Sequence, residues 1–250
     1  MKQLLKYIFD KLGYKVIKRK KGYHYVPNIY GHRSHKLIDL RENKEFESYA
    51  TKVIRDKTTS LYYDRLYTFY QLLRHIKNLN VPKPLLVEAG VYKGGSAYFI
   101  ASVAAKLFQG DCELWAVDTF EGFDKKDLPY GTEGHNSPGV FGDVDCASVK
   151  KYLAAFPFVT VIKGRIQNSV HLLNDKRCVF AHLDMDLYEP TKFALDFFGR
   201  KLVPFGAIVV DDHNTLSCPG IAKAVNEFLG TNAKFIKLDL PGQALLIKYI

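Results

Sequence analysis

From residue 81 to the C-terminus, short apolar runs alternate with stretches whose apolar residues recur at helical spacing. The apolar runs predict strands near 85–89, 112–117, 158–162, 179–183 and 206–210. The stretches between them predict helices near 95–108, 146–155, 166–174, 190–200 and 219–229. Short, almost entirely apolar strands that alternate with helices are typical of a parallel sheet buried on both faces. We therefore predict an α/β fold with a Rossmann-like, doubly wound, mostly parallel sheet.

The two ends of the chain depart from this alternation. At the C-terminus, AKFIKLDL and GQALLIKYI are strand-like runs joined by the turn signal PG, which predicts an antiparallel hairpin. At the N-terminus, apolar residues recur at helical spacing within 4–12 and 61–76, which predicts helices joined by a loop. The prolines of VPKPLL then end the helical pattern. We divide the chain into a helical N-terminal extension, 1–80, that forms a lid or an oligomer contact, and an α/β domain, 81–250.

The composition is that of a globular protein. With 250 residues, 47% of them hydrophobic, the chain is long enough for one large domain and a small appendage. Its apolar runs are shorter than the roughly 18 residues of a membrane span, so we expect none. The N-terminus carries lysines through its apolar part and has no small-residue cleavage site, which predicts a soluble, cytoplasmic protein. Four scattered cysteines without a CxxC pair are interpreted as free thiols.

The net charge of +10 would suit a polyanionic partner. Much of the excess lies in KVIKRKK, residues 15–21, and the charges are more mixed afterwards. Such a basic arm can contact nucleic acid, an anionic glycan or a membrane surface, or it can simply be solvated. We interpret it as a solvated arm and expect no nucleic-acid partner. A non-enzymatic protein that binds polyanions on a Rossmann scaffold stays as an alternative hypothesis.

Acidic residues follow two of the predicted strands. Asp184 and Asp186 come after 179–183, and Asp211 and Asp212 end the run GAIVVDD. Ligands of doubly wound sheets bind beyond the carboxyl ends of the strands. On neighbouring strands, three of these carboxylates would meet within a few Å and repel one another unless a cation neutralised them. Carboxylate oxygens favour a hard divalent ion, Mg²⁺ before Ca²⁺ or Mn²⁺, so the sequence predicts a metal site here.

The first two predicted strands end in a different kind of sequence. The turn VEAGVYKGGSA contains Glu88, Gly90 and Ser96, and its glycines let the backbone approach a ligand closely. Glu88 is suited to a cationic amino group, and Asp118, at the end of the second strand, to ribose hydroxyls. Neither GxGxxG nor a Walker sequence is present, which argues against the two commonest phosphate-binding motifs.

Four of these segments match a known family as a set: VEAGVYKGGSA, DTFEGF, LDMDLYEPT and GAIVVDDHN. In type, order and spacing they resemble the macrocin O-methyltransferase family, over about residues 55–250. The resemblance implies a class I, S-adenosylmethionine-dependent enzyme that methylates a hydroxyl on a sugar of a natural product. It also implies Mg²⁺ held by Asp184, Asp211 and Asp212.

The same resemblance implies a set of residues that hold the cofactor. Thr59 and Ser60 belong to it and, together with Arg65, to a segment that closes over the cofactor. The cofactor-binding set is Thr59, Ser60, Glu88, Gly90, Tyr92, Ser96, Asp118, Phe120, Gly164 and Asp184.

Transfer of a methyl group to a hydroxyl needs a base for the proton. His135 lies in the insertion GTEGHNSPGVFGDV, which can fold over the site, and histidine titrates near neutral pH. Asp186, two residues beyond the first metal ligand, is the other candidate, although it is also suited to capping the helix that follows. We expect His213 to shape the substrate pocket and His182, inside a strand, to be a core residue.

The acceptor is expected to be a small molecule or a saccharide. A catechol-type O-methyltransferase shares the same metal chemistry and stays as an alternative, as does a regulatory module that binds the sulfonium cofactor without catalysis. Assembly into a homo-oligomer is left open.

Overall fold

The computed structural model describes residues 11–12, 40–128, 137–173 and 176–250. The chain divides into two units, Met1–Leu37 and Ile38–Ile250, and the second contains the sheet and its helices. His135 and the basic run 15–21 lie outside the described residues, so what the sequence predicts for them stays a prediction.

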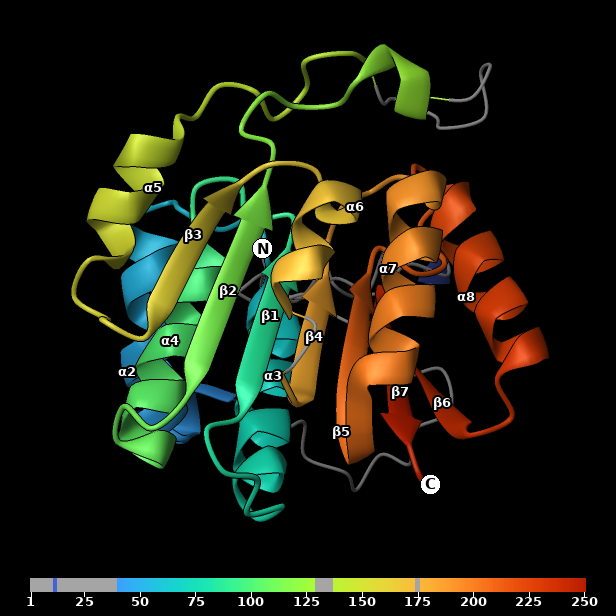
Figure 1. Ribbon diagram of the computed structural model, residues 1–250. Helices are drawn as coiled ribbons and strands as arrows, with labels where there is room; N and C mark the ends of the chain where they lie inside the picture. Colours follow the sequence, from blue (N-terminus) through green and yellow to red (C-terminus); the bar gives the residue numbers. More distant parts are fainter. Residues whose placement is uncertain (1–10, 13–39, 129–136, 174–175) are drawn as a thin grey trace. The chain divides into compact units, whose positions relative to one another are not determined.

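Seven strands form one sheet in the order β3-β2-β1-β4-β5-β7-β6 (Figure 1). The first five pair in parallel, while β7 pairs antiparallel with β5 and with β6. The five strands predicted before the hairpin and the hairpin itself are confirmed, and with them the fold class. The bounds are β1 Leu85–Ala89, β2 Glu113–Asp118, β3 Val159–Lys163, β4 Cys178–Leu183, β5 Leu202–Asp211, β6 Phe235–Leu240 and β7 Gln243–Lys248.

Helices cover both faces of this sheet (Figure 1). One face carries α2 Lys44–Arg55, α3 Tyr63–Lys77 and α4 Gly95–Phe108. The other carries α6 Ile166–Ser169, α7 Tyr188–Lys201 and α8 Pro219–Thr231, and α5 Cys146–Leu153 packs beside β2 and α4. Short 3-10 turns occur at Leu40–Glu42, Lys125–Asp127 and Val170–Leu173. Among the described residues, no helix is both long and apolar enough to span a bilayer.

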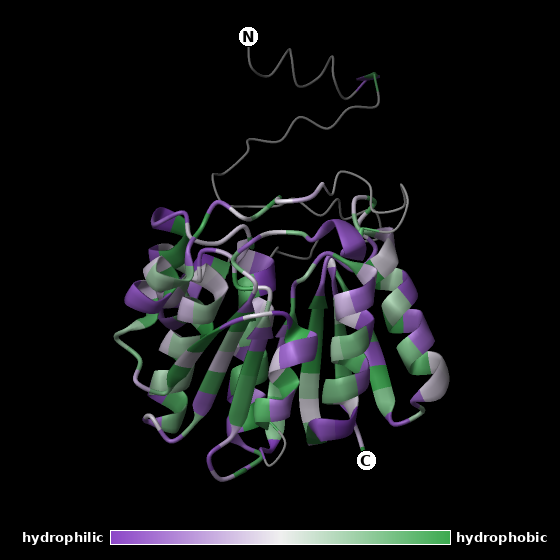
Figure 2. Cartoon of the chain, turned by 45° about the horizontal axis from the view of Figure 1, so that its top comes forward, coloured by the Kyte–Doolittle hydropathy of each residue, from purple (hydrophilic) through white to green (hydrophobic). Residues whose placement is uncertain are grey.

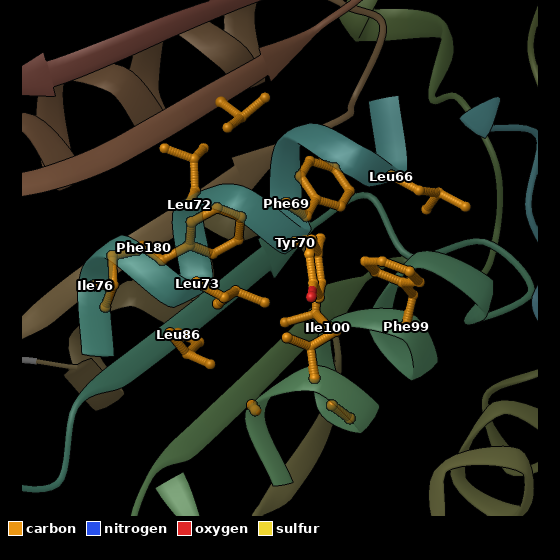
Figure 3. Close-up of a cluster of buried hydrophobic side chains, with 14 of the residues drawn as sticks. Leu66, Phe69, Tyr70, Leu72, Leu73, Ile76, Leu86, Phe99, Ile100 and Phe180 are labelled. Carbon is orange, nitrogen blue, oxygen red and sulfur yellow. The ribbon is translucent and has the colours of Figure 1, made fainter. Parts of the chain in front are cut away.

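Alternation along the strands explains the two layers. Leu86 and Phe180 face α3 and α4, whereas Val87 and Ala181, their neighbours along the strands, belong to the cluster beneath α7 and α8. Figure 2 shows mostly apolar strands between helices of mixed hydropathy. Figure 3 shows the first cluster, in which side chains of α3 and α4 meet β1 and β4, with Phe69 against Phe180 at a ring distance of 5.9 Å. Each such buried side chain stabilises the fold by about 1.5–3 kcal/mol. The packed cores on both faces of the sheet therefore hold the strand ends in place.

Helix α2 corrects the prediction for the N-terminal region. The prediction of a loop between 12 and 61 is wrong over Lys44–Arg55, which is helical. Asn43 caps this helix by accepting a hydrogen bond from the backbone N–H of Phe46 at 3.1 Å. Phe46, Ala50 and Val53, spaced by four and three residues, are fully buried. Three apolar residues among many charged ones gave too short a pattern to be recognised.

Candidate active site

A pocket of about 320 Å³ lies at the carboxyl ends of β1, β2, β4 and β5. The strand order reverses between β1 and β4, which is where doubly wound sheets bind their ligands. The volume is that of a site for a small molecule. Most of the predicted site residues line it: Thr59, Ser60, Arg65, Gly90, Tyr92, Ser96, Asp118, Gly164, Asp184, Asp186, Asp211 and Asp212.

Two glycines bring separate segments together at the pocket. Gly90 has φ +87°, and a Cβ there would collide with the carbonyl oxygen of Asp184, so only glycine lets the ends of β1 and β4 approach this closely. Gly95 donates its N–H to the carbonyl oxygen of Thr58 at 3.1 Å, and a Cβ on it would lie 2.5 Å from that residue's backbone. The segment before α3 therefore lies directly on the glycine-rich turn.

Asp118 fixes the turns on its side of the pocket. Its Oδ2 accepts hydrogen bonds from the N–H groups of Val91 at 2.7 Å and Tyr92 at 2.8 Å. Its Oδ1 accepts the N–H of Phe120 at 2.8 Å. Tyr92 and Phe120 have left-handed backbones, with φ of 47° and 52°, which cost free energy that these bonds offset. Asp118 thus shapes the pocket as well as lining it, and Oδ1 keeps acceptor capacity for a ligand.

Two of the predicted cofactor residues lie behind the wall rather than in it. Among the described residues, those that line the pocket include neither Glu88 nor Phe120. Glu88 and His182 sit opposite each other on β1 and β4, fully buried, with 2.8 Å between Oε1 and Nδ1. His182 also lies 4.5 Å from the ring of Phe69, which confirms that it is a core residue. Contact of Glu88 with the cofactor stays a prediction.

Asp184, Asp211 and Asp212 converge as predicted. One carboxylate oxygen from each lies within 4.8 Å of the others. We call these three residues the acidic triad. Burial raises the pKa of Asp184 well above its usual range, and the charges of Asp211, Asp186 and Asp212 raise it further. Burial also raises the pKa of Asp211, although Arg65 opposes the shift.

A cation and an amide already bind the triad. Nη1 of Arg65 makes a close ion pair with Oδ2 of Asp211 and lies 3.2 Å from Oδ1 of Asp212. Gln243 donates its Nε2–H to the other oxygen of Asp211 at 2.8 Å. A cationic nitrogen in contact with two of the three carboxylates shows that the site attracts positive charge. Three convergent carboxylates also form the oxygen donor set that Mg²⁺ prefers. The residues present therefore fit a divalent ion.

Asp186 stands next to the triad. Its pKa is raised by burial and by a hydrogen bond with Asp212, and Sγ of Cys218 lies 3.7 Å from its Oδ1. Asp186, Asp212 and Cys218 form a second group within 4.8 Å. The residue before α7 in the N-cap position is Leu187, so Asp186 does not cap that helix. Its backbone is left-handed, with φ 59°, and its carboxyl lies within 4.8 Å of that of Asp212 in the acidic triad.

His213 faces away from this edge. It is 2% exposed, and its Nδ1 lies 3.4 Å from Oδ1 of Asp239 on β6. The residues described as lining the pocket do not include it. His213 therefore packs under the hairpin of β6 and β7 and does not line the pocket.

Sequence reasoning missed several residues of the site. Gln243 reaches the triad because it pairs with Asp211 in the antiparallel register of β5 and β7, a relation visible only once that register is known. Arg165, after β3, makes a close ion pair with Asp127 and a second with Asp124 at 3.3 Å. All three line the pocket. They tie residues 124–127, after β2, to the loop after β3, and no local motif marks them.

The chain is similar in sequence to proteins named as O-methyltransferases. The 8-demethyl-8-(2,3-dimethoxy-alpha-L-rhamnosyl)-tetracenomycin-C 4'-O-methyltransferase of Streptomyces olivaceus is 28% identical over 153 residues, which cover 58% of each chain. The mycinamicin III 3''-O-methyltransferase of Micromonospora griseorubida is 23% identical over 170 residues, 63% of this chain and 66% of the relative. The chain therefore spans about three fifths to two thirds of the length of these relatives.

A solved structure agrees in fold. The O-methyltransferase NovP superposes with a TM-score of 0.62 at 20% identity, over 76% of this chain and 81% of NovP. The sequence profile of the family described as macrocin-O-methyltransferase (TylF) matches residues 23–242. That match covers the pocket, the acidic triad and nearly all of the sheet, and it shows that this chain belongs to the macrocin-O-methyltransferase (TylF) family.

Proposed function

We propose that this chain is an S-adenosylmethionine-dependent O-methyltransferase that acts, with Mg²⁺, on a hydroxyl of a sugar or of a glycosylated small molecule. The observation that carries the proposal is the acidic triad at the edge of a pocket suited to a small molecule. Family membership supports methyl transfer to oxygen. The name of the Streptomyces relative, which specifies a rhamnosyl compound, supports a sugar acceptor.

The cofactor would lie along the glycine-rich turn. S-adenosylmethionine supplies a methyl group on a positively charged sulfur. Asp118 would accept hydrogen bonds from ribose hydroxyls through the free capacity of Oδ1, while Gly90 leaves room for close approach of the ligand. Thr59 and Ser60, held on the turn through Thr58 and Gly95, would close over the ligand and exclude water.

Mg²⁺ would be held by Asp184, Asp211 and Asp212. When bound, it supplies a Lewis acid that lowers the pKa of a hydroxyl and fixes the position of its oxygen. The triad is at the wall of the same pocket as Asp118, so an acceptor there meets both halves of the site. Correct positioning of the two reacting groups accounts for a large share of such rate enhancements.

The proton of the acceptor hydroxyl would pass to Asp186. Its carboxyl lines the pocket, and the same surroundings that raise its pKa favour proton uptake. His135 is the other candidate base and lies outside the described residues. Replacement of Asp186 and of His135, each in turn, decides which of the two is the base.

The test is methyl transfer from S-adenosylmethionine to a panel of glycosides and catechols, with and without chelator. The proposal expects transfer to a glycoside, loss of turnover in excess chelator, and recovery on addition of Mg²⁺. Transfer to catechols alone would favour the catechol-type alternative. Full turnover in chelator would remove the metal from the proposal and leave the methyltransferase, and binding of S-adenosylmethionine without transfer to any acceptor would favour a regulatory module.

A further inference from the structure

Arg65 is an arginine placed among the proposed metal ligands. It projects from the first turn of α3, and only 17% of its side chain is exposed. Its Nη1 contacts Asp211, the last residue of β5, and Asp212, the residue after it. Burial would lower the pKa of this guanidinium, but the charges of Asp211, Asp212 and Asp184 together raise it. All three members of the acidic triad therefore act on one cation of the chain itself.

The hairpin between β6 and β7 holds the guanidinium in this place. Gly242, at the turn with φ +70°, lies so close that a Cβ there would collide with Nη2 of Arg65 and lie 3.0 Å from its Cζ. The next residue, Gln243, is 1% exposed and binds the Asp211 oxygen that Arg65 leaves free. Arg65 is thus packed between a turn and the acids. A contact built from two distant parts of the chain is more than a chance surface ion pair.

Charge explains what such an arginine does. Three carboxylates carry a charge of −3, and an arginine keeps its +1 at every pH at which proteins fold. With Mg²⁺ the triad and Arg65 together are neutral, whereas the triad with Mg²⁺ alone retains −1. Without the ion, Arg65 is the positive partner of Asp211 and Asp212. A divalent ion that enters the site meets the positive charge of Arg65 beside the oxygens of Asp211 and Asp212 to which it would bind. Like charges a few Å apart repel strongly away from bulk water.

Resting on the proposed metal-assisted function, we propose that Arg65 is the resident counter-ion of the acidic triad and sets its affinity for the divalent ion. It holds Asp211 and Asp212 together in the metal-free protein and weakens metal binding by competing for their oxygens. Arg65 is a positioning residue in this scheme. Because it lies three residues beyond the pocket-lining segment 58–62, it also links that wall to the metal site.

The experiment measures Mg²⁺ binding to the full chain by calorimetry and thermal unfolding in chelator. Arg65→Gln removes the charge, and Arg65→Lys keeps it. Arg165→Gln is the matched control, since Arg165 lines the same pocket but pairs with Asp124 and Asp127. We expect Arg65→Gln to bind Mg²⁺ about tenfold or more tightly than the parent chain, to unfold at a lower temperature in chelator, and to regain stability with Mg²⁺. Arg65→Lys and Arg165→Gln should bind within about threefold of the parent chain, since both keep the charge at the triad.

The outcomes separate this inference from the proposed function. Mg²⁺ binding that is equal or weaker in Arg65→Gln overturns the inference and leaves the metal site in place. If neither the parent chain nor Arg65→Gln binds Mg²⁺, both the inference and the metal part of the proposed function are overturned. Where Arg65→Gln does not fold in chelator, Arg65→Lys decides, because a change of Mg²⁺ affinity above about tenfold with the charge retained contradicts a role that rests on charge.

Discussion

The two halves of the pocket hold their acids in different ways. At the ends of β1 and β2, Asp118 is a single carboxylate that receives three backbone N–H groups. At the ends of β4 and β5, three carboxylates of the acidic triad lie close together, and the side chains that bind them include those of Arg65, Gln243 and Thr215. The first arrangement is complete without a ligand, whereas the second carries excess negative charge. The first half therefore suits the proposed cofactor, and the second suits the proposed divalent ion.

The largest expected effect is that of Asp184→Asn. It removes one anionic ligand and should lower turnover by about 1000-fold, since Lewis-acid stabilisation is worth several kcal/mol and each 1.4 kcal/mol is tenfold in rate. Binding of S-adenosylhomocysteine should stay within about threefold of the parent chain, because Asp118 and its turns are untouched. Methyl-transfer rates and calorimetry measure the two quantities. The exposed Asp111 provides the control, Asp111→Asn, and equal turnover in both variants would contradict a role for the triad.

Asp186→Asn should lower kcat by about 100-fold if Asp186 is the base. The variant should still bind Mg²⁺, because the three proposed ligands, Asp184, Asp211 and Asp212, are unchanged. The comparison is with His135→Gln in the same assay. A larger loss of kcat in His135→Gln than in Asp186→Asn would transfer the role of base to the insertion.

Asp118→Asn tests the independence of the cofactor half. An amide cannot accept on both sides, so it loses the N–H of Phe120 or those of Val91 and Tyr92. Affinity for S-adenosylhomocysteine should fall about tenfold, the cost of one hydrogen bond to a charged group. Mg²⁺ affinity, measured by calorimetry on the same sample, should not change. An equal fall in both affinities would mean that the two halves are one coupled unit.

The smallest expected effect is on the pH dependence of stability in chelator. The folded pKa values of Asp184 and Asp211 are raised above the aspartate value of about 3.9. The folded state therefore binds protons more tightly than the unfolded state, and this stability is present below that value and lost as the pH rises through the folded pKa. When the pH is raised from about 5 to about 8, the unfolding temperature of the parent chain should fall more than that of Asp184→Asn. A parallel pH dependence in the two proteins, or no reduction of the difference by Mg²⁺, would contradict the account.

The sequence predicted the sheet well because its signals are local. Each of the five parallel strands contains a short apolar run, and the run GAIVVDD carries its two acids at its end. Parallel pairing then brings the ends of β4 and β5 to the same edge, so the convergence of Asp184 with Asp211 and Asp212 follows from topology. The turn signal PG placed the hairpin, and helix α3 agrees with the periodicity of 61–76.

What the sequence left out depends on contacts between distant segments. The ion pair of Arg65 with Asp211 joins residues 146 positions apart, and Gln243 reaches the same acid only through the register of the hairpin. The pairing of Glu88 with His182 likewise depends on the register of β1 and β4, while contact of Glu88 with the cofactor stays a prediction. His213 was expected at the pocket and lies beneath β6. Such relations require the fold before they can be seen.

The most direct measurement is a crystal structure of the full chain grown with S-adenosylhomocysteine and Mn²⁺, with the ion located by its anomalous signal. The account predicts one peak in contact with carboxylate oxygens of Asp184, Asp211 and Asp212, beside the cofactor. A peak at the group of Asp186, Asp212 and Cys218 instead, or no peak in a crystal that holds the cofactor, would contradict it.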